Sequence, residues 1–248
     1  MSQHPNLLAI DCATLPASVA VVTHEGTLAE SVHDDDLRSD AWLGGAIETC
    51  LARASLGIDQ LDGFAVSVGP GTFTGIRVGI ATALGLAAPH RLPVAGIITL
   101  DALALIGLRR ADLVAACIDA RRGQVYAAVY APPDTPSALP LTPVWGPTVC
   151  GPDDLPPPQL APRAPDTGEH GDPPKLLTLG SGAPLLAEGA GLVSVDGPLP
   201  LAASVGHLAL RAWPAGAHAP LHWPPPEPLY LRPPDAIPPR NPLLDNDG

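Results

Sequence analysis

The stretch VGPGTFTGIRVGI, residues 68–80, places three glycines and a proline between an apolar run and a helical pattern. The preceding residues Phe64–Val68 have the length and composition of a short buried strand. The residues that follow, to about Ala88, keep helical spacing. A strand, a glycine turn and a helix N-terminus can offer backbone N–H groups to an anion. The stretch therefore indicates an α/β fold, with either a phosphate site or a tight turn capped by Thr72 or Thr74.

The glycine spacing matches neither common phosphate motif. A P-loop needs a lysine that reaches the phosphates, and this stretch has none. The dinucleotide fingerprint needs G-x-G-x-x-G, whereas Gly69, Gly71 and Gly75 are spaced G-x-G-x-x-x-G. A specific nucleotide motif is therefore not indicated.

The helix after the turn has one face of small residues, because Gly75, Gly79 and Ala83 recur every four positions. Glycine inside a helix costs up to about 1 kcal/mol relative to alanine, so such a face usually has a packing reason. The helix predicted at about Leu37–Leu56 also carries small residues. The two faces predict either a contact within the molecule or a surface for a partner.

The order of elements predicts two lobes on one plan. Three strands at Leu7–Ala13, Ala17–Thr23 and Thr27–His33, followed by alternating helices and strands, give a ribonuclease-H-like order. A hairpin around the RRG at 121–123, strands within 175–180 and 192–196 and a helix over 202–213 then repeat it. We predict mixed sheets flanked by helices, with an N-terminal lobe over 1–100 and a second lobe over 101–213. The second lobe would carry a proline-rich insertion at about 131–174, and the proline-rich segment 214–248 would pack through its PLYLR.

Composition limits the function. The formal net charge is −12 and Lys175 is the single lysine, so the chain is a poor candidate for holding nucleic acid alone. The sequence has neither a signal peptide nor an apolar run that could span a bilayer, which predicts a cytoplasmic protein with no membrane contact. The four cysteines are scattered, which predicts reduced and largely buried thiols.

Four blocks identify a resemblance. GPGTFTGIRVGIATALGLA closely resembles a stretch of the TsaB family of bacterial tRNA threonylcarbamoyladenosine biosynthesis proteins. LLAIDCATLPASVAVV resembles the family's opening strand pair, IDARRGQVYAAVY its second-lobe hairpin, and PLYLR its C-terminal end. The blocks occur in the family's order. The resemblance implies a two-lobed actin-like fold of the sugar kinase and Hsp70 superfamily.

The resemblance also implies a role. It implies a non-catalytic scaffold subunit in the complex that transfers a threonylcarbamoyl group to adenosine 37 of tRNAs reading codons that start with A. The partners would be the catalytic subunit TsaD and the ATPase TsaE, and tRNA would be held only through the complex. Catalytic relatives carry H-x-E-G-H, and here Thr99 and Leu103 stand where its histidines would be. Neither residue can replace imidazole, so we expect no catalytic residue, no metal ligand and no intrinsic cofactor.

The residues expected to bind the partner combine the two small-residue faces with neighbouring charged groups. They are Ala41, Gly44, Gly45, Glu48, Gly75, Arg77, Gly79 and Ala83. Without the partner, the same surface could form a homodimer.

The alternative function is an ATPase or small-molecule kinase of the same fold, or a nucleotide held only at the interface with TsaD. Its phosphate contacts would be Asp11, Gly69, Gly71, Thr72 and Thr74, with Asp11 orienting a metal. Cys12 and Ala13 replace the family's usual Thr-Ser after Asp11, and Asp40 stands where the family commonly has a histidine. The first of these departures weakens the case for ATP binding by this chain alone.

Three further groups have ordinary explanations. His218 and His222 have the helical spacing of metal ligands, but Pro220 between them argues against a helix. The acidic run at 34–36 is expected to be a solvated helix start. Asp119, Arg121 and Arg122 are expected to be charges on a hairpin turn, with a minor binding role since the matching family stretch faces the inter-lobe cleft.

Overall fold

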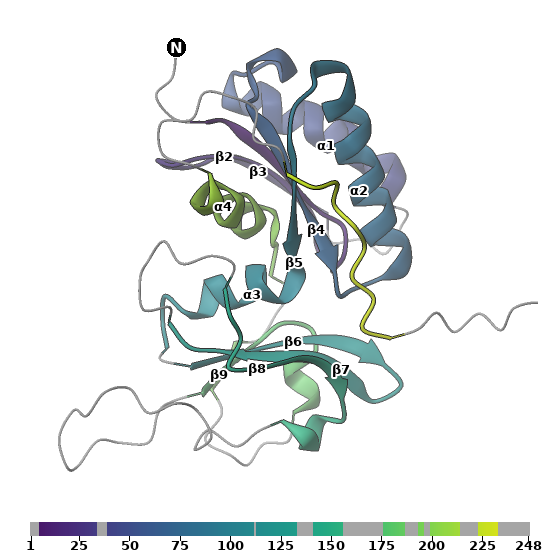
Figure 1. Cartoon of the computed structure of the whole chain (residues 1–248), viewed down its shortest axis with the longest axis vertical. Helices are drawn as coiled ribbons and strands as arrows, with labels where there is room; N and C mark the ends of the chain where they lie inside the picture. The colour runs from purple at the N-terminus through teal and green to yellow at the C-terminus, as the bar shows by residue number, and fades with distance from the viewer. Residues whose placement is uncertain are drawn as a thin grey trace, which may run out of the picture.

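The computed structural model of the chain describes residues 5–33, 39–111, 113–132, 141–155, 176–186, 193–195, 199–213 and 223–232. Figure 1 shows two lobes, each built on one sheet, with helices between and outside them. Among the described residues, no helix has the length and apolar character needed to cross a membrane.

The first sheet has the order β3-β2-β1-β4-β5. Its strands are β1 (Leu7–Asp11), β2 (Ala17–Thr23), β3 (Gly26–His33), β4 (Gly63–Gly69) and β5 (Val94–Ile98). β1, β2 and β3 form an antiparallel meander, and β4 and β5 extend the sheet in parallel with β1. β1 and β4 are buried along their whole length, which explains their continuous apolar runs.

The second sheet repeats this topology, with the order β10-β9-β6-β7-β8. Its strands are β6 (Leu113–Arg121), β7 (Gln124–Tyr130), β8 (Trp145–Cys150), β9 (Leu176–Leu179) and β10 (Val193–Val195). β6, β7 and β8 are antiparallel, and β9 and β10 follow in parallel with β6. Two sheets with the same connectivity confirm the predicted two-lobed, ribonuclease-H-like plan.

Four α-helices complete the layers. α1 (Ser39–Ala54) and α2 (Phe73–Ala87) cover one face of the first sheet, whereas α4 (Ala202–Ala212) covers the other (Figure 1). α3 (Thr99–Gly107) connects the sheets and shares one core with α4 and both sheets. Short 3₁₀ helices lie at Ile58–Gln60, Ala88–His90, Pro152–Asp154 and Ala183–Leu185.

α4 was expected in the second lobe, residues 101–213, but it packs on the first. Its sequence position follows the second sheet, yet it packs against β1 and β2 of the first. A side chain at Gly206 would place its Cβ 2.4 Å from a methyl group of Val22, so glycine permits this close approach. The division of the chain at residues 100 and 213 remains a prediction.

A segment that we call the C-terminal strap, residues 223–232, runs from the first lobe to the second. The Leu229 amide donates to the carbonyl oxygen of Val68 at 2.7 Å. Arg232 Nη1 donates to the carbonyl oxygen of Ala120 at 2.6 Å, and its Nη2 donates to Gln124. The PLYLR motif thus contacts both lobes.

The four cysteines are free thiols, and Cys12, Cys50 and Cys117 are buried while Cys150 is partly buried. The prediction of reduced, largely buried thiols is confirmed. Burial raises the pKa of Cys12 and Cys117 to about 12, so these thiols are protonated at neutral pH.

Candidate functional site

The turn after β1 is fixed by the buried carboxyl of Asp11. One oxygen of Asp11 accepts hydrogen bonds from the Ser67 hydroxyl and from the Ala13 amide at 3.0 Å. The other accepts from Thr14 Oγ1 at 2.6 Å. Burial raises the pKa of Asp11, and these hydrogen bonds oppose that effect. The carboxyl is 0% exposed, so its contacts are those of a residue that shapes the turn.

The glycine loop, residues 69–75, packs directly on the turn after β1. A Cβ at Gly71 would lie 2.3 Å from the carbonyl oxygen of Ala13, and one at Gly75 would lie 1.8 Å from that of Cys12. The Thr72 amide donates to Ala13 O at 2.8 Å, and the Gly69 amide donates to Thr99 Oγ1 at 3.1 Å. Two backbone donors of the loop therefore already have acceptors within the chain. Thr72 is the N-cap residue of α2, without a side-chain capping bond, and Thr74 lies exposed in the first turn.

An inter-lobe cleft of about 610 Å³ lies beside the loop. Its first-lobe wall includes Thr14 and residues 70–73, and its second-lobe wall includes residues 118–122 and Ser181. The strap residues 229–232 close one side. The phosphate candidates Gly71 and Thr72 thus face a cleft, whereas Asp11 and Gly69 do not line it.

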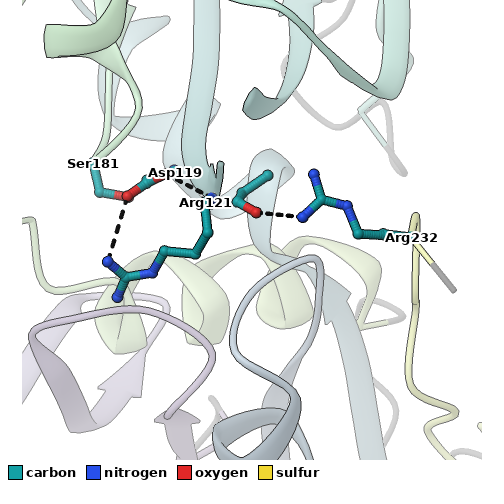
Figure 2. A network of polar contacts seen from close by, with 5 residues as sticks. Asp119, Arg121, Ser181 and Arg232 are labelled. Carbon is teal, nitrogen blue, oxygen red and sulfur yellow. Dashed lines mark hydrogen bonds and ion pairs between the residues drawn. The ribbon is translucent and has the colours of Figure 1, made fainter. Parts of the chain in front are cut away.

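The charged groups of the cleft come mainly from the β6–β7 turn. Asp119 accepts from the Arg121 amide at 2.7 Å, and its carboxylate lies 3.6 Å from the Arg121 guanidinium (Figure 2). The Ser181 hydroxyl accepts from the Asp119 amide at 3.1 Å, and Arg232 enters from the strap (Figure 2). Arg121 and Arg122 both have positive φ, 64° and 58°. The turn and the strap together present three arginines and one carboxylate to the cleft, a composition suited to an anion.

Positions 99 and 103 serve the packing of α3. Thr99 is buried and its hydroxyl accepts from the glycine loop, while Leu103 is 2% exposed in the shared core. Among the residues that the structure describes, no three His, Cys, Asp or Glu side chains gather in a geometry that could hold a metal. His218, His222 and Asp34–Asp36 lie outside the described residues.

The small-residue face of α2 points inward, which corrects its interpretation as a partner surface. Gly75, Gly79 and Ala83 are buried, and a Cβ at Gly79 would lie 3.3 Å from Val66 and 3.7 Å from Cys12. The glycines allow α2 to pack closely on β1 and β4 of its own lobe. Periodic small residues show that one side of a helix is crowded, and a sheet and a partner produce the same pattern.

The other predicted contacts lie outward on the two helices. Gly44, Gly45 and Glu48 are exposed on α1, and Ala41 belongs to its first turn. On α2 the exposed positions include the predicted Arg77 and three that the sequence analysis missed, Ala81, Leu84 and Gly85. A Cβ at Gly44, Gly45 or Gly85 would meet nothing within 4 Å. None of the described residues covers the outward side of α1 and α2, and its glycines keep that side nearly flat.

An aromatic cluster joins this surface to the cleft. The Arg77 guanidinium lies 3.6 Å from the centroid of the Phe73 ring, and its Nε donates to the Tyr230 hydroxyl at 3.0 Å. The rings of Phe73 and Tyr230 stack at 5.1 Å, although both residues are substantially exposed. Arg77, which the sequence analysis assigned to the partner surface, thus packs against its own chain through the strap.

Comparisons with known proteins show what the chain is similar to. The sequence model of the family described as TsaD, tRNA N6-adenosine threonylcarbamoyltransferase, matches residues 37–135. A Haemophilus influenzae protein named tRNA threonylcarbamoyladenosine biosynthesis protein TsaB is 40% identical over 131 residues, covering 50% of this chain and 53% of the relative. The Escherichia coli protein of the same name is 36% identical over 126 residues, covering 50% and 54%. The matched part of the chain thus spans about half the length of these curated relatives.

A solved structure covers more of the fold. It comes from Pseudomonas aeruginosa and is described as an uncharacterized protein with similarity to peptidase YEAZ. The TM-score is 0.69 at 26% identity, over 92% of this chain and 100% of that one. The fold and these similarities define a two-lobed α/β protein of the actin-like class. Within that class, the chain is similar to the TsaB proteins of Haemophilus influenzae and Escherichia coli over about half of its length.

Proposed function

We propose that the chain is a non-catalytic scaffold subunit that binds a TsaD-type catalytic subunit. Together with a TsaE-type ATPase, the pair would support transfer of a threonylcarbamoyl group to adenosine 37 of tRNAs reading codons that start with A. The names of the curated relatives support a role in this modification. The net charge of −12 supports recruitment of tRNA by the partner in the cytoplasm.

The observation that carries the proposal is the outward side of α1 and α2. Gly44, Gly45 and Gly85 leave this side nearly flat, and Leu84, 37% exposed, adds apolar area. Helices of a partner can approach such a surface closely and bury backbone and apolar atoms together. The surface also lies within the segment that matches the TsaD model, so a related subunit could offer similar helices.

The non-catalytic part of the proposal rests on α3. Thr99 and Leu103, which stand where catalytic relatives carry histidines, are both buried in the shared fold. Leucine has no metal-ligating atom, and the Thr99 hydroxyl already accepts a hydrogen bond from Gly69. These two residues favour a supporting role for this chain.

The test uses Gly45→Arg and Gly85→Arg, analysed by size-exclusion chromatography with light scattering against a TsaD-type subunit from the same source. Both glycines lie in open space, so the variants should fold while a mixed species is lost. Gly79→Arg is a poor test because that position faces Val66 inside the lobe. Ala212→Arg is the matched control, since Ala212 is exposed on α4, across the first sheet.

The three variants separate the outcomes. Loss of the mixed species in both glycine variants, with Ala212→Arg unaffected, would support docking through α1 and α2. A mixed species that survives both substitutions would place the interface elsewhere. Without the partner, the same surface would form a homodimer, and that dimer should disappear with the same two variants.

A second candidate function is nucleotide binding, and the inter-lobe cleft favours it. Arg121, Arg122 and Arg232 line the cleft together with Gly71 and Thr72. Titration of the isolated chain with ATP separates the two functions. Micromolar binding that weakens with Arg121→Ala, together with turnover, would favour the ATPase or kinase. Binding only in the presence of the partner would favour a nucleotide at the shared interface.

A further inference from the structure

A second cavity, of about 400 Å³, lies at the edge of the first sheet. Its walls are Ala95–Ile98 of the edge strand β5, the side of α4 formed by Leu208, Ala209 and Ala212, and Trp223–Glu227 of the strap. The volume falls within the range of about 300–1,000 Å³ that is usual for small-molecule sites. Neither the partner surface nor the inter-lobe cleft includes these residues, apart from the shared strap.

The charges of this cavity have one sign. Asp101 and Glu227 line it, and none of its described lining residues is Lys, Arg or His. All the other lining residues are aliphatic, proline, glycine or tryptophan. An apolar chamber whose charged groups are all carboxylates repels anions and favours a cation with an apolar body.

Asp101 is the inner of the two carboxylates. It is 6% exposed, and the Tyr130 hydroxyl donates to its Oδ1 at 2.6 Å. Among the described residues this is the one hydrogen bond that its side chain has, so the carboxylate has acceptor capacity left. Burial raises the pKa of Asp101 to about 6, which leaves the group mostly ionised at neutral pH.

A buried carboxylate without a cation is costly, and a ligand that supplies the cation recovers that cost. Trp223 offers the cavity an aromatic ring, which attracts cations over its face. The ring is held in place by edge-to-face packing on Trp213, with centroids 5.5 Å apart. The residues therefore provide a counter-ion, an aromatic wall and a proline wall around one space.

We propose that this cavity binds a small organic cation: a primary ammonium group on a compact apolar body. The ammonium group pairs with the Asp101 carboxylate, and the apolar body lies among β5, α4 and the prolines of the strap. The inference is independent of the scaffold function, because no residue of α1 or α2 lines this cavity.

Benzylamine, which is protonated at pH 7.5, is the probe, and benzyl alcohol and benzoate are its neutral and anionic controls. Isothermal titration of the full chain gives the affinities, and indole N–H signals in heteronuclear NMR report contact with Trp223. We expect benzylamine to bind about tenfold or more tightly than benzyl alcohol, since a hydrogen bond to a charged group contributes about 1.5–3 kcal/mol. Equal affinities, or no binding of benzylamine, would overturn the proposal.

Two variants locate the site. Asp101→Asn keeps the side-chain shape and should remove the preference for benzylamine over benzyl alcohol. Ala212→Phe fills the cavity from an exposed helix position, so it should abolish binding even if Asp101→Asn proves to be misfolded. Asp59→Asn, on an exposed 3₁₀ helix, is the control for loss of one negative charge. Retained binding in Ala212→Phe would place the amine elsewhere.

A lysine side chain could supply the same ammonium group. Nα-acetyl-lysine amide, which carries the lysine side chain between two peptide groups, tests that source. We expect it to bind more weakly than benzylamine, because its backbone is too polar for the apolar chamber. Weaker binding than benzylamine supports a small-molecule ligand, and tighter binding would replace it with a lysine of a partner protein.

Discussion

At the scale of single residues, Gly75 and Gly85 lie on one helix and have opposite surroundings. A Cβ at Gly75 would lie 1.8 Å from the carbonyl oxygen of Cys12, whereas a Cβ at Gly85 would meet nothing within 4 Å. We predict that Gly75→Ala lowers the free energy of unfolding by about 3 kcal/mol or more, because the turn after β1 must move. Gly85→Ala should raise it by about 0.5–1 kcal/mol through helix propensity. Urea unfolding measures both, and equal effects would contradict the close packing of α2 on the turn.

Asp101 gives a prediction for pH. Its pKa is about 6 in the folded chain against 3.8 for the ordinary side chain, because burial disfavours the charge. The folded state therefore holds the proton more tightly, and stability falls as the pH rises between these two values. The difference of about two pKa units corresponds to about 3 kcal/mol. The free energy of unfolding of Asp101→Asn, minus that of the wild type, should rise by about that amount between pH 4 and pH 8.

Urea unfolding at several pH values checks this, with Asp59→Asn as the control for net charge. A difference between Asp101→Asn and the wild type that does not change with pH would mean that Asp101 is better solvated than its burial indicates. Tyr130→Phe should increase the effect, because the tyrosine hydrogen bond lowers the pKa of Asp101.

At the scale of elements, the first turn of α4 depends on β2 and β3. The Ser18 hydroxyl accepts from the amides of Leu201 and Ala202, at 3.2 and 3.0 Å, and Glu30 accepts from the amide of Ala203. These groups satisfy amides that a helix start leaves without partners. We predict that Ser18→Ala lowers the free energy of unfolding by about 1–2 kcal/mol, because buried donors lose their acceptor.

Ser204→Ala is the matched control, since Ser204 is in the same helix and its side chain has no hydrogen bond to any of the described residues. Thermal unfolding of both variants gives the comparison. A loss in Ser204→Ala as large as that in Ser18→Ala would show that the effect comes from helix propensity instead of capping.

The sequence predicted most elements because their patterns are local. The strands β1, β2 and β4 are apolar runs bounded by turn residues, and they form where they were expected. β8 (Trp145–Cys150) was missed because it contains Gly146 and Pro147, which argue against a strand. An edge strand tolerates a proline, and β8 lies at the edge of its sheet beside β7.

The candidate site was predicted only in part. The glycines of α2 were recognised as a contact face, but local periodicity carries no information on whether the sheet or a partner covers that face. The cavity at Asp101 had no signal in the sequence, since it joins residues of β5, α3, α4 and the strap that lie far apart in the chain. Such sites depend on long-range packing, which the order of elements alone does not fix.

At the scale of the whole molecule, two lobes of the same topology share one core on one side and are separated by the inter-lobe cleft on the other. α3 and α4 connect the sheets on the core side, and the strap connects them at the inter-lobe cleft. The contact between the strap and the second lobe depends on one side chain, because Arg232 donates hydrogen bonds to Ala120 on β6 and to Gln124 on β7. The separation of the lobes at the cleft should therefore be sensitive to Arg232.

We predict that Arg232→Ala loosens the second-lobe end of the strap while the shared core stays intact. A hydrogen bond from a charged group contributes about 1.5–3 kcal/mol, so amides of the β6–β7 turn and of Leu229 should exchange with deuterium at least about tenfold faster. Amides of β1 and β4, which are buried on both faces, should keep their protection. Arg110→Ala, at an exposed position just after α3, is the control and should leave the protection of every segment unchanged.

If the β6–β7 turn keeps its protection in Arg232→Ala, then the core helices alone hold the lobes together. If protection is lost throughout the chain, the strap is part of the cooperative fold, and the inter-lobe cleft cannot open without unfolding.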